Sequence, residues 1–268
     1  MPLCLRQHII SMQQFTHIHL ETVDSTNNFL RCYQPEEESH ITLVTADYQT
    51  AGRGQRGNSW ESEEGKNVVY SLLIHPTTVR PSQIFSISEI AALSVCQALN
   101  EFLPEDKLQA SKGGFCVKWP NDIYYKDSKI AGILIETDLM GGRIANAIIG
   151  VGININQQQF LSDAPNPISL YQILGHETSR QLVMDSMMKH FTHLYYQLES
   201  GEVTSLHTLF MQHLYRSEGF HPYTDEGGTF QARIVNVELS GHLILEDTES
   251  LQRRYAFKEV SFVIPPCK

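Results

Sequence analysis

The sequence has little of what marks secreted, membrane-spanning or disulfide-stabilised proteins. Its N-terminus is polar and mixed, without the long apolar run of a signal peptide or a membrane span. Only two of its 268 residues are tryptophan and only five are cysteine, namely Cys4, Cys32, Cys96, Cys116 and Cys267. This odd, scattered set contains no C-x-x-C pair, which argues against a disulfide framework or a zinc cluster. We therefore expect a protein of the reducing cytoplasm.

Basic residues are also scarce. The chain has 20 Lys and Arg against 30 Asp and Glu, a formal net charge of −10. Nonspecific binding to nucleic acid or to an anionic membrane rests on many positive charges that neutralise phosphates, so this balance disfavours DNA and membranes as partners. Any phosphate bound by this chain needs a local basic site. The hydrophobic fraction of 41% is ordinary for a globular protein and allows a buried core.

Strand-like and helix-like segments are mixed along most of the chain. Alternating or β-branched runs predict strands at 18–22, 41–48, 67–74, 115–119, 129–139 and 144–155. Helical periodicity predicts helices at 27–33, from 84 to about 102, 180–199 and 203–214. The three strands that follow the second helix are apolar enough to lie in a covered sheet, and residues 157–168 form a polar loop.

The last fifty residues change character. The segments 229–238, 242–247 and 251–257 read as short alternating strands separated by turn residues. This spacing is typical of a small β-barrel, and no low-complexity linker precedes it. We expect two parts, residues 1–217 and 218–268, in direct contact.

A glycine-rich loop, TAGRGQRGNSW, follows the strand at 41–48. Its G-x-G-x-x-G pattern at 52–57 does not indicate a dinucleotide fold, because turn residues and a strand follow it instead of a helix. A protein kinase is excluded as well, because no V-A-I-K, H-R-D or D-F-G element follows. Two interpretations stay open. The loop is either an anion site, with backbone N–H groups and the cations Arg53 and Arg56, or a solvated hairpin.

A second polar cluster, Lys118-Trp119-Pro120-Asn121-Asp122, ends a predicted strand, and Lys129 opens the next one. If these strands are antiparallel neighbours, Asp122 and Lys129 meet at one edge of the sheet, where they could hold a phosphate and Mg²⁺ together. Alternatively, Asp122 serves a turn and Lys129 is a solvated charge. His190 and His193 stand at helical spacing without a further ligand in view, and we interpret them as surface residues.

Five motifs in a fixed order resemble those of biotin protein ligases: DSTN at 24–27, AGRG-x-x-G at 51–57, KWPND at 118–122, KIAGILIE at 129–136 and GVGIN at 150–154. The resemblance implies an α+β fold, with a mixed β-sheet flanked by helices of the class II synthetase-like type and a C-terminal SH3-like β-barrel. It also implies an enzyme that activates biotin with ATP and Mg²⁺ and transfers it to a lysine of a biotin carboxyl carrier domain, as a monomer or a homodimer.

The resemblance implies roles for individual residues. Biotin contacts fall on Ser25, Thr26, Asn27, Gln49, Gly52, Arg53, Gly54, Lys129, Gly132 and Gly152, and nucleotide contacts fall on Gln55, Arg56, Trp60, Lys118, Asn121, Asp122, Lys129 and Asn154. Lys129, Arg53 and Asp122 are the implied catalytic residues, with Asp122 also the candidate Mg²⁺ ligand.

The chain departs from the family pattern at two places. Gln55 stands where many relatives carry a second loop arginine, which predicts weaker retention of the adenylate. Pro167 stands near a position where some relatives place tryptophan against adenine, and Phe160 is the candidate substitute. Both the glycine-rich loop and the 157–168 loop are expected to order over the adenylate and exclude water.

Four related functions compete with this hypothesis. Lipoate ligases usually carry a longer R-R-x-S-G-G-G loop, and octanoyl transferases need a nucleophile that we do not identify here. A biotin-responsive repressor needs a DNA-reading unit, for which the fewer than about 20 residues before the first predicted strand are too few. A non-catalytic adenylate-binding regulator is disfavoured by the retained Lys118, Asn121, Asp122 and Lys129.

Overall fold

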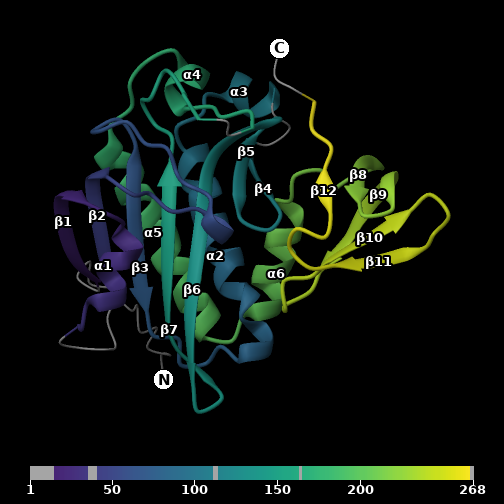
Figure 1. Ribbon diagram of the computed structural model, residues 1–268, viewed down its shortest axis with the longest axis horizontal. Coiled ribbons are helices and arrows are strands. Elements are labelled where there is room, and N and C mark those ends of the chain that lie inside the picture. The colour runs from purple at the N-terminus through teal and green to yellow at the C-terminus, as the bar shows by residue number, and fades with distance from the viewer. Residues whose placement is uncertain (1–14, 36–40, 111–113, 163–164, 266–268) are drawn as a thin grey trace, which may run out of the picture.

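The protein folds into two β-sheets, the first of which carries the helices (Figure 1). The structure, a computed structural model, describes residues 15–35, 41–110, 114–162 and 165–265. The first sheet has seven strands in the order β1-β2-β3-β7-β6-β5-β4. They are β1 Phe15–Val23, β2 Ile41–Gln49, β3 Val68–Ile74, β4 Phe115–Lys118, β5 Asp122–Tyr125, β6 Ser128–Met140 and β7 Arg143–Ile153. β1 and β2 are parallel and the other neighbours are antiparallel, so the predicted mixed sheet is confirmed.

One adjacency on which the sequence analysis made an expectation conditional is absent from the sheet. The strands at 115–119 and 129–139 are not neighbours, because the intervening residues Asp122–Tyr125 form β5 between them. Tight turns at the two ends of β5 let it pair with β4 on one side and with β6 on the other. Lys118 of β4 then lies opposite Asp122 of β5. The edge of β4 is covered in turn by the segment after the last helix, where Val117 bonds His213 and Tyr215 through the backbone.

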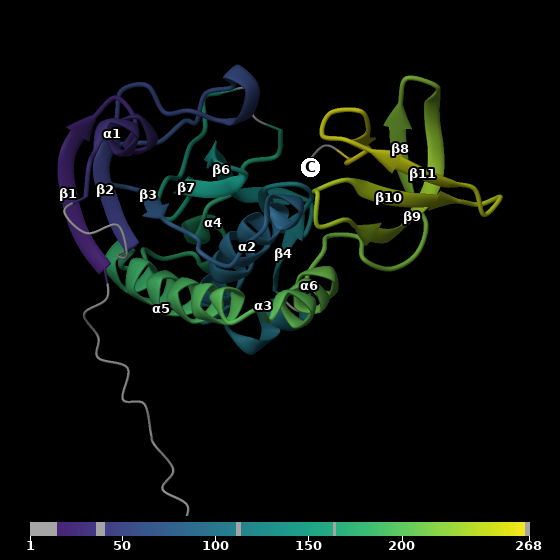
Figure 2. The same ribbon diagram turned by 90° about the horizontal axis from the view of Figure 1, so that it is seen from below.

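The helices cover both faces of the first sheet. They are α1 Thr26–Cys32, α2 Phe85–Asn100, α3 Glu105–Ala110, α4 Leu170–Leu174, α5 Arg180–Glu199 and α6 Val203–Gln212, with 3₁₀ turns η1 Gln55–Gly57 and η2 Pro81–Gln83. Figure 2 shows α2, α5 and α6 on one face and α1 on the other. The four predicted helices are confirmed, whereas the short α3 and α4 were not predicted. Local capping explains α4: Ser169 and Gln172 form a reciprocal capping box, and Gly175 ends the helix with a φ of 81°.

The main core lies between the sheet and α2. By length and composition alone, Pro81–Asn100 could cross a membrane, but 72% of its most apolar window is buried inside the protein, as in a core helix. Leu93, Val95 and Leu99 are fully buried there. On the opposite face, Leu30 of α1 joins Val44, Leu73 and Ile148 in a smaller cluster. Because both faces are covered, the central strands are apolar on both sides.

The second sheet forms a small C-terminal β-domain, whose limits 218–268 stay a prediction. Its strands are β8 His221–Asp225, β9 Gly228–Val237, β10 Leu243–Asp247, β11 Gln252–Tyr255 and β12 Ser261–Phe262, in the order β11-β10-β9-β8-β12. This antiparallel arrangement is consistent with the predicted SH3-like fold. Within the described residues, however, no pairing of β11 with β12 closes the sheet into a barrel.

The two sheets are joined by direct contacts around the start of α2. The Phe85 amide donates to Leu239 O at 3.1 Å, and Trp119 Nε1 donates to Gly241 O at 3.0 Å. Deeper in this contact, Glu89 of α2 is fully buried, and its Oε1 lies 2.7 Å from His207 Nδ1 on α6. His207 Nε2 lies 3.1 Å from Asn236 Oδ1 on β9. His207 therefore connects the helical layer to the C-terminal sheet.

This contact predicts a pH dependence of stability. The hydrogen bond to Glu89 raises the pKa of His207 in the folded protein above 6.5, despite partial burial. A raised folded pKa contributes stability that is fully present below the unfolded pKa and is lost as pH rises through the folded pKa. His207→Gln should cost about 1–3 kcal/mol at pH 6 and less at pH 8, measured by urea unfolding. The exposed His193→Gln serves as the control, and parallel pH curves for wild type and His207→Gln would contradict the assignment.

Candidate active site

A cavity of about 1390 Å³ opens between the first sheet, the glycine-rich loop and the C-terminal domain. All five sequence motifs contribute to its wall, although the first and the last of them lie more than a hundred residues apart in the chain. Of the predicted site residues, those that line it are Ser25, Thr26, Asn27, Gln49, Arg53, Gly54, Gln55, Trp60, Lys118, Asn121, Asp122, Lys129, Gly132, Gly152 and Asn154. Two do not belong to this set. Gly52 does not line the cavity, and the side chain of Arg56 lies outside what the structure describes.

One end of the cavity is polar and uncharged. Ser25, Thr26 and Asn27, at the start of α1, are each only 3% exposed. Gln49 Oε1, at the end of β2, accepts from the Thr26 amide at 2.8 Å and from its hydroxyl at 3.0 Å. Ser71 of β3, which sequence reasoning missed, places its hydroxyl 2.7 Å from Thr26 Oγ1. Such fixed, neutral donors and acceptors suit a small polar ring better than an ion.

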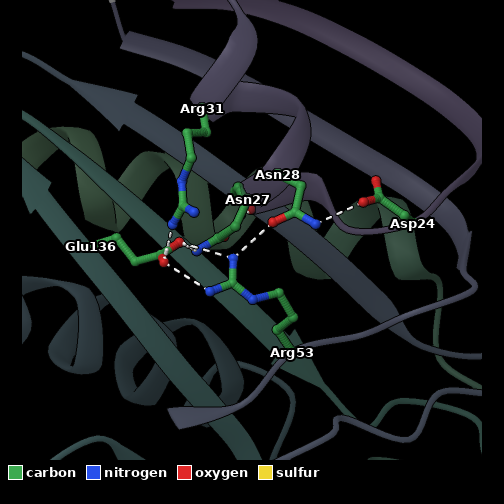
Figure 3. A network of polar contacts seen from close by, with 7 residues as sticks. Asp24, Asn27, Asn28, Arg31, Arg53 and Glu136 are labelled. Carbon is green, nitrogen blue, oxygen red and sulfur yellow. Dashed lines mark hydrogen bonds and ion pairs between the residues drawn. The ribbon is translucent and has the colours of Figure 1, made fainter. Parts of the chain in front are cut away.

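Arg53 of the glycine-rich loop is held by an acidic residue that the sequence analysis left without a role. Figure 3 shows Glu136 of β6 facing Arg53, Arg31 and Asn27. Arg53 Nη2 donates to Glu136 Oε1 at 2.9 Å, and its Nη1 donates to Asn28 Oδ1 at 2.8 Å. Burial opposes ionisation of Glu136, but hydrogen bonds from Asn27 and Arg53 outweigh it and lower its pKa. The loop is thereby anchored to α1 and β6, and the role of Arg53 as a substrate clamp stays a prediction.

A pair of glycines forms the floor of the cavity. Gly132 of β6 pairs directly with Gly152 of β7, and the indole of Trp60 lies on both. A Cβ at Gly152 would be 2.3 Å from Trp60 Cε2 and Nε1, and one at Gly132 would be 2.9 Å from Cζ3. Only glycine permits this approach at either position. The Trp60 Nε1 is buried without a hydrogen-bond partner among the described residues, so it is a donor available to a ligand.

The other end of the cavity is ionic. Lys129 Nζ lies 2.6 Å from Asp122 Oδ1, and Lys118 Nζ lies 3.9 Å from Asp122 Oδ2. The predicted meeting of Asp122 and Lys129 at one sheet edge is therefore present, although β5 brings it about. Burial lowers the pKa of Lys118, and the nearby Asp122 only partly opposes this shift. Lys129 also lies 5.6 Å from the Trp60 ring centroid, within reach of a cation–π contact.

Two amide residues complete this end in different ways. Asn121 uses its Nδ2 to bond Ile133 O at 2.6 Å, which fixes the turn before β5. Asn154 bonds Ile168 O through its Nδ2 at 3.1 Å, but its Oδ1 is buried and unpartnered among the described residues, as is Gln55 Oε1. A buried acceptor without a donor is costly, so both oxygens favour a ligand that donates hydrogen bonds.

The C-terminal domain supplies a wall that the sequence analysis did not predict. Phe257, Lys258 and Phe262 line the cavity, and Phe262 lies beneath Lys118 at 5.1 Å. No motif marked this segment, because its contribution depends on how the two sheets meet. With Lys258, the described lining carries four cations, Arg53, Lys118, Lys129 and Lys258, against the carboxylates of Glu61 and Asp122. A chain of net charge −10 thus has the local basic site that phosphate binding needs.

The donor set fits a magnesium ion that arrives with a nucleotide. Among the described residues, no three His, Cys, Asp or Glu side chains gather as a metal site. Of the two lining carboxylates, Glu61 accepts hydrogen bonds from Leu161 and Ser162, which leaves Asp122. Mg²⁺ is commonly held by one or two carboxylates together with phosphate oxygens and water. Asp122 could thus supply a single ligand.

Comparison with known proteins agrees with this geometry. The family profile described as the biotin/lipoate A/B protein ligase family matches residues 20–154. The bifunctional ligase/repressor BirA of Bacillus subtilis is 30% identical over 220 residues, covering 80% of this chain and 64% of that protein. The biotin–[acetyl-CoA-carboxylase] ligase of Paracoccus denitrificans is 29% identical over 164 residues, covering 59% of this chain and 64% of that protein. The matched region thus spans less than two thirds of either relative.

A solved structure extends the likeness to the whole fold. The biotin protein ligase from Aquifex aeolicus in complex with biotin and ATP has a TM-score of 0.73 at 24% identity, and the match covers 93% of this chain and 99% of that chain. The two proteins share a fold that includes the C-terminal sheet. Since the family profile covers half of the chain and all five motifs line one cavity, the chain belongs to the biotin/lipoate A/B protein ligase family.

Proposed function

We propose that this chain is an ATP-dependent biotin protein ligase, which forms biotinyl-5′-adenylate and transfers the biotinyl group to a lysine of a biotin carboxyl carrier domain. Both relatives described above are named ligases, and the Aquifex structure holds biotin and ATP. The scattered cysteines, of which Cys32, Cys96 and Cys116 are free, suit the cytoplasm.

The observation that carries the proposal is the order in which an uncharged polar end, an aromatic middle and a charged end follow one another along the cavity. The uncharged end at Thr26 and Gln49 is separated from Lys129 by strands β3 and β7, and the Trp60 indole lies over the glycine floor between them. Biotin has the same order, with a neutral ureido ring, an apolar chain and a terminal carboxylate. The carboxylate would then lie beside Lys129.

In the first step, a biotin carboxylate oxygen attacks the α-phosphorus of ATP, and the bond to pyrophosphate breaks. Both reactants are anions, so the main requirement is to neutralise charge and to align them. Lys129 supplies a cation at the carboxylate, while Lys118 and Lys258 supply cations on the nucleotide side. Mg²⁺ bound with ATP would neutralise further phosphate charge, with Asp122 as its protein ligand. The buried oxygens of Asn154 and Gln55 would accept from the nucleotide.

In the second step, the neutral amine of the carrier lysine attacks the acyl carbon, AMP leaves, and the amine loses a proton. Asp122 is our candidate for orienting that amine and accepting its proton, because it is the lining carboxylate that the 157–162 segment does not occupy. No covalent enzyme intermediate is required. Exclusion of water protects the acyl-adenylate, which hydrolyses readily.

The function is tested by supplying the purified chain with ATP, Mg²⁺ and an apo carrier domain, together with either biotin or lipoate. We expect the carrier lysine to gain the mass of the biotinyl group with biotin and no mass with lipoate. Modification by lipoate alone would assign the related lipoate reaction. Ligand binding without any modification would assign a non-catalytic regulator, and either result would overturn the proposal.

The residue at position 55 is expected to affect how fast the adenylate is released. Its buried Oε1 is neutral, and an arginine there would donate a charge-assisted hydrogen bond to phosphate. We expect Gln55→Arg to slow release of preformed labelled adenylate about tenfold, measured by rapid filtration. Gln181→Arg, the same exchange on the exposed face of α5, controls for added charge. Equal release from Gln55→Arg and wild type would place Gln55 away from the phosphate.

A further inference from the structure

Glu61 connects two segments of the cavity wall that lie a hundred residues apart. Its Oε1 accepts from the Leu161 amide at 2.9 Å, and its Oε2 accepts from the Ser162 amide at 2.8 Å. Burial opposes ionisation of Glu61, but hydrogen bonds from Ser162, Leu161 and Gln157 outweigh it and lower its pKa. The carboxylate is therefore ionised at neutral pH, and its hydrogen bonds come mainly from residues 157–162.

Gln157 makes a second connection between the same segments. It is 2% exposed, and its Nε2 donates to Glu61 Oε1 at 3.1 Å. Its Oε1 accepts from the Glu63 amide at 3.1 Å and from Asn67 Nδ2 at 2.5 Å. A buried amide that uses both of its ends in this way has one favourable position, so it fixes where residues 157–162 begin.

The two connected segments carry different parts of the site. Glu61 directly follows Trp60, whose indole lies on the glycine floor near Lys129. The segment 157–162 carries Phe160 and Ser162, which line the cavity, whereas Leu161 between them is 90% exposed. Little apolar burial holds residues 158–162 in place. Their position therefore depends on polar contacts, of which those to Glu61 are the most direct.

We propose that Glu61 is a positioning residue for adenylate formation, which ties the wall formed by Phe160 and Ser162 to the Trp60 segment. The proposal rests on the function proposed above and adds a residue that contacts no reacting atom. It implies that the two walls move as one unit. Without the carboxylate, the 157–162 segment would open independently, and the nucleotide would lose that wall while the polar end at Thr26 stayed intact.

Glu61→Gln tests the proposal with two readouts. The amide keeps the size of the side chain but loses the charge, and its NH₂ would face an N–H donor. We expect the KM for ATP in pyrophosphate release to rise about tenfold with kcat changed less than about threefold, because coupling between sites is commonly of this size. Chymotrypsin cleavage after Phe160 or Leu161 should accelerate about tenfold, since local opening becomes easier.

Glu64→Gln is the matched control, because it removes the same charge from an exposed side chain three residues on. It should match wild type in both readouts, and Glu61→Asp should restore part of the protection. If Glu61→Gln is cleaved by chymotrypsin at the same rate as Glu64→Gln and has the same kinetic constants, the proposal is overturned.

The cleavage readout needs no catalysis, so it separates failure of this proposal from failure of the proposed function. A measurement on the unaltered protein covers the case in which Glu61→Gln does not fold. Hydrogen exchange at the Leu161 and Ser162 amides should be slow, because both donate to Glu61. Exchange as fast as in an open loop would overturn the proposal.

Discussion

Replacing Lys129 with alanine is expected to slow formation of biotinyl-adenylate by a factor on the order of 10²–10³, the loss found when one preorganised charge donor is removed. Lys129 lies 2.6 Å from Asp122 and faces the same cavity as the polar pocket at Thr26. Its ammonium group would meet the biotin carboxylate as charge moves toward phosphorus. The measurement is release of labelled pyrophosphate with biotin and ATP at saturating concentrations.

Lys189→Ala controls for the loss of a lysine, because the Lys189 side chain is 76% exposed on α5 and does not line the cavity. Biotin binding by Lys129→Ala should be weakened less than the rate of adenylation, since the polar end is unchanged. Normal pyrophosphate release by Lys129→Ala would contradict the proposed role.

Adding one methyl group at Gly152 is expected to weaken biotin binding roughly tenfold or more, because overpacking a tight contact costs about 1–3 kcal/mol. The new Cβ would lie 2.3 Å from the indole of Trp60, so the ring must move off the floor. A displaced ring occupies volume that the substrate needs and leaves the neighbourhood of Lys129. Titration calorimetry with biotin measures the effect.

A double mutant separates this clash from other effects of the methyl group. Trp60→Ala removes the ring, and adding Gly152→Ala to it should then change biotin affinity by less than about twofold. The same loss in both backgrounds would show that the indole is not the cause. Unfolding curves of all three variants check that the sheet is intact.

The extent to which sequence predicted this site differs from residue to residue. Through the family resemblance that they carry, the five motifs predicted many residues of the sheet wall, among them Gly152 and Asn154, but not Tyr70 or Tyr124, which also line the cavity. Lys129 and Asp122 were expected to meet and do so. The strand β5 between them was missed, because four residues give too little periodicity to separate a strand from a turn.

Residues whose role depends on distant partners could not be predicted. Glu136 stands inside a quoted motif, but its contact with Arg53 depends on the loop folding back across β6. Glu61 has an ordinary acidic sequence context, and its partners lie a hundred residues away. Lys258 reaches the cavity because the C-terminal sheet lies against α2. Such long-range contacts are set by the tertiary fold, which local patterns do not encode.

Because tryptophan is scarce in this chain, its intrinsic fluorescence reports on the cavity. The only two tryptophans, Trp60 and Trp119, both line the cavity, one on the glycine pair and the other, 3% exposed, beside the C-terminal domain. Light absorbed selectively by indole therefore reports on this site and on no other part of the chain. A substrate that displaces or covers Trp60 would change the emission spectrum, while Trp119 would report on the contact between the two domains. The protein needs no added dye for a binding assay.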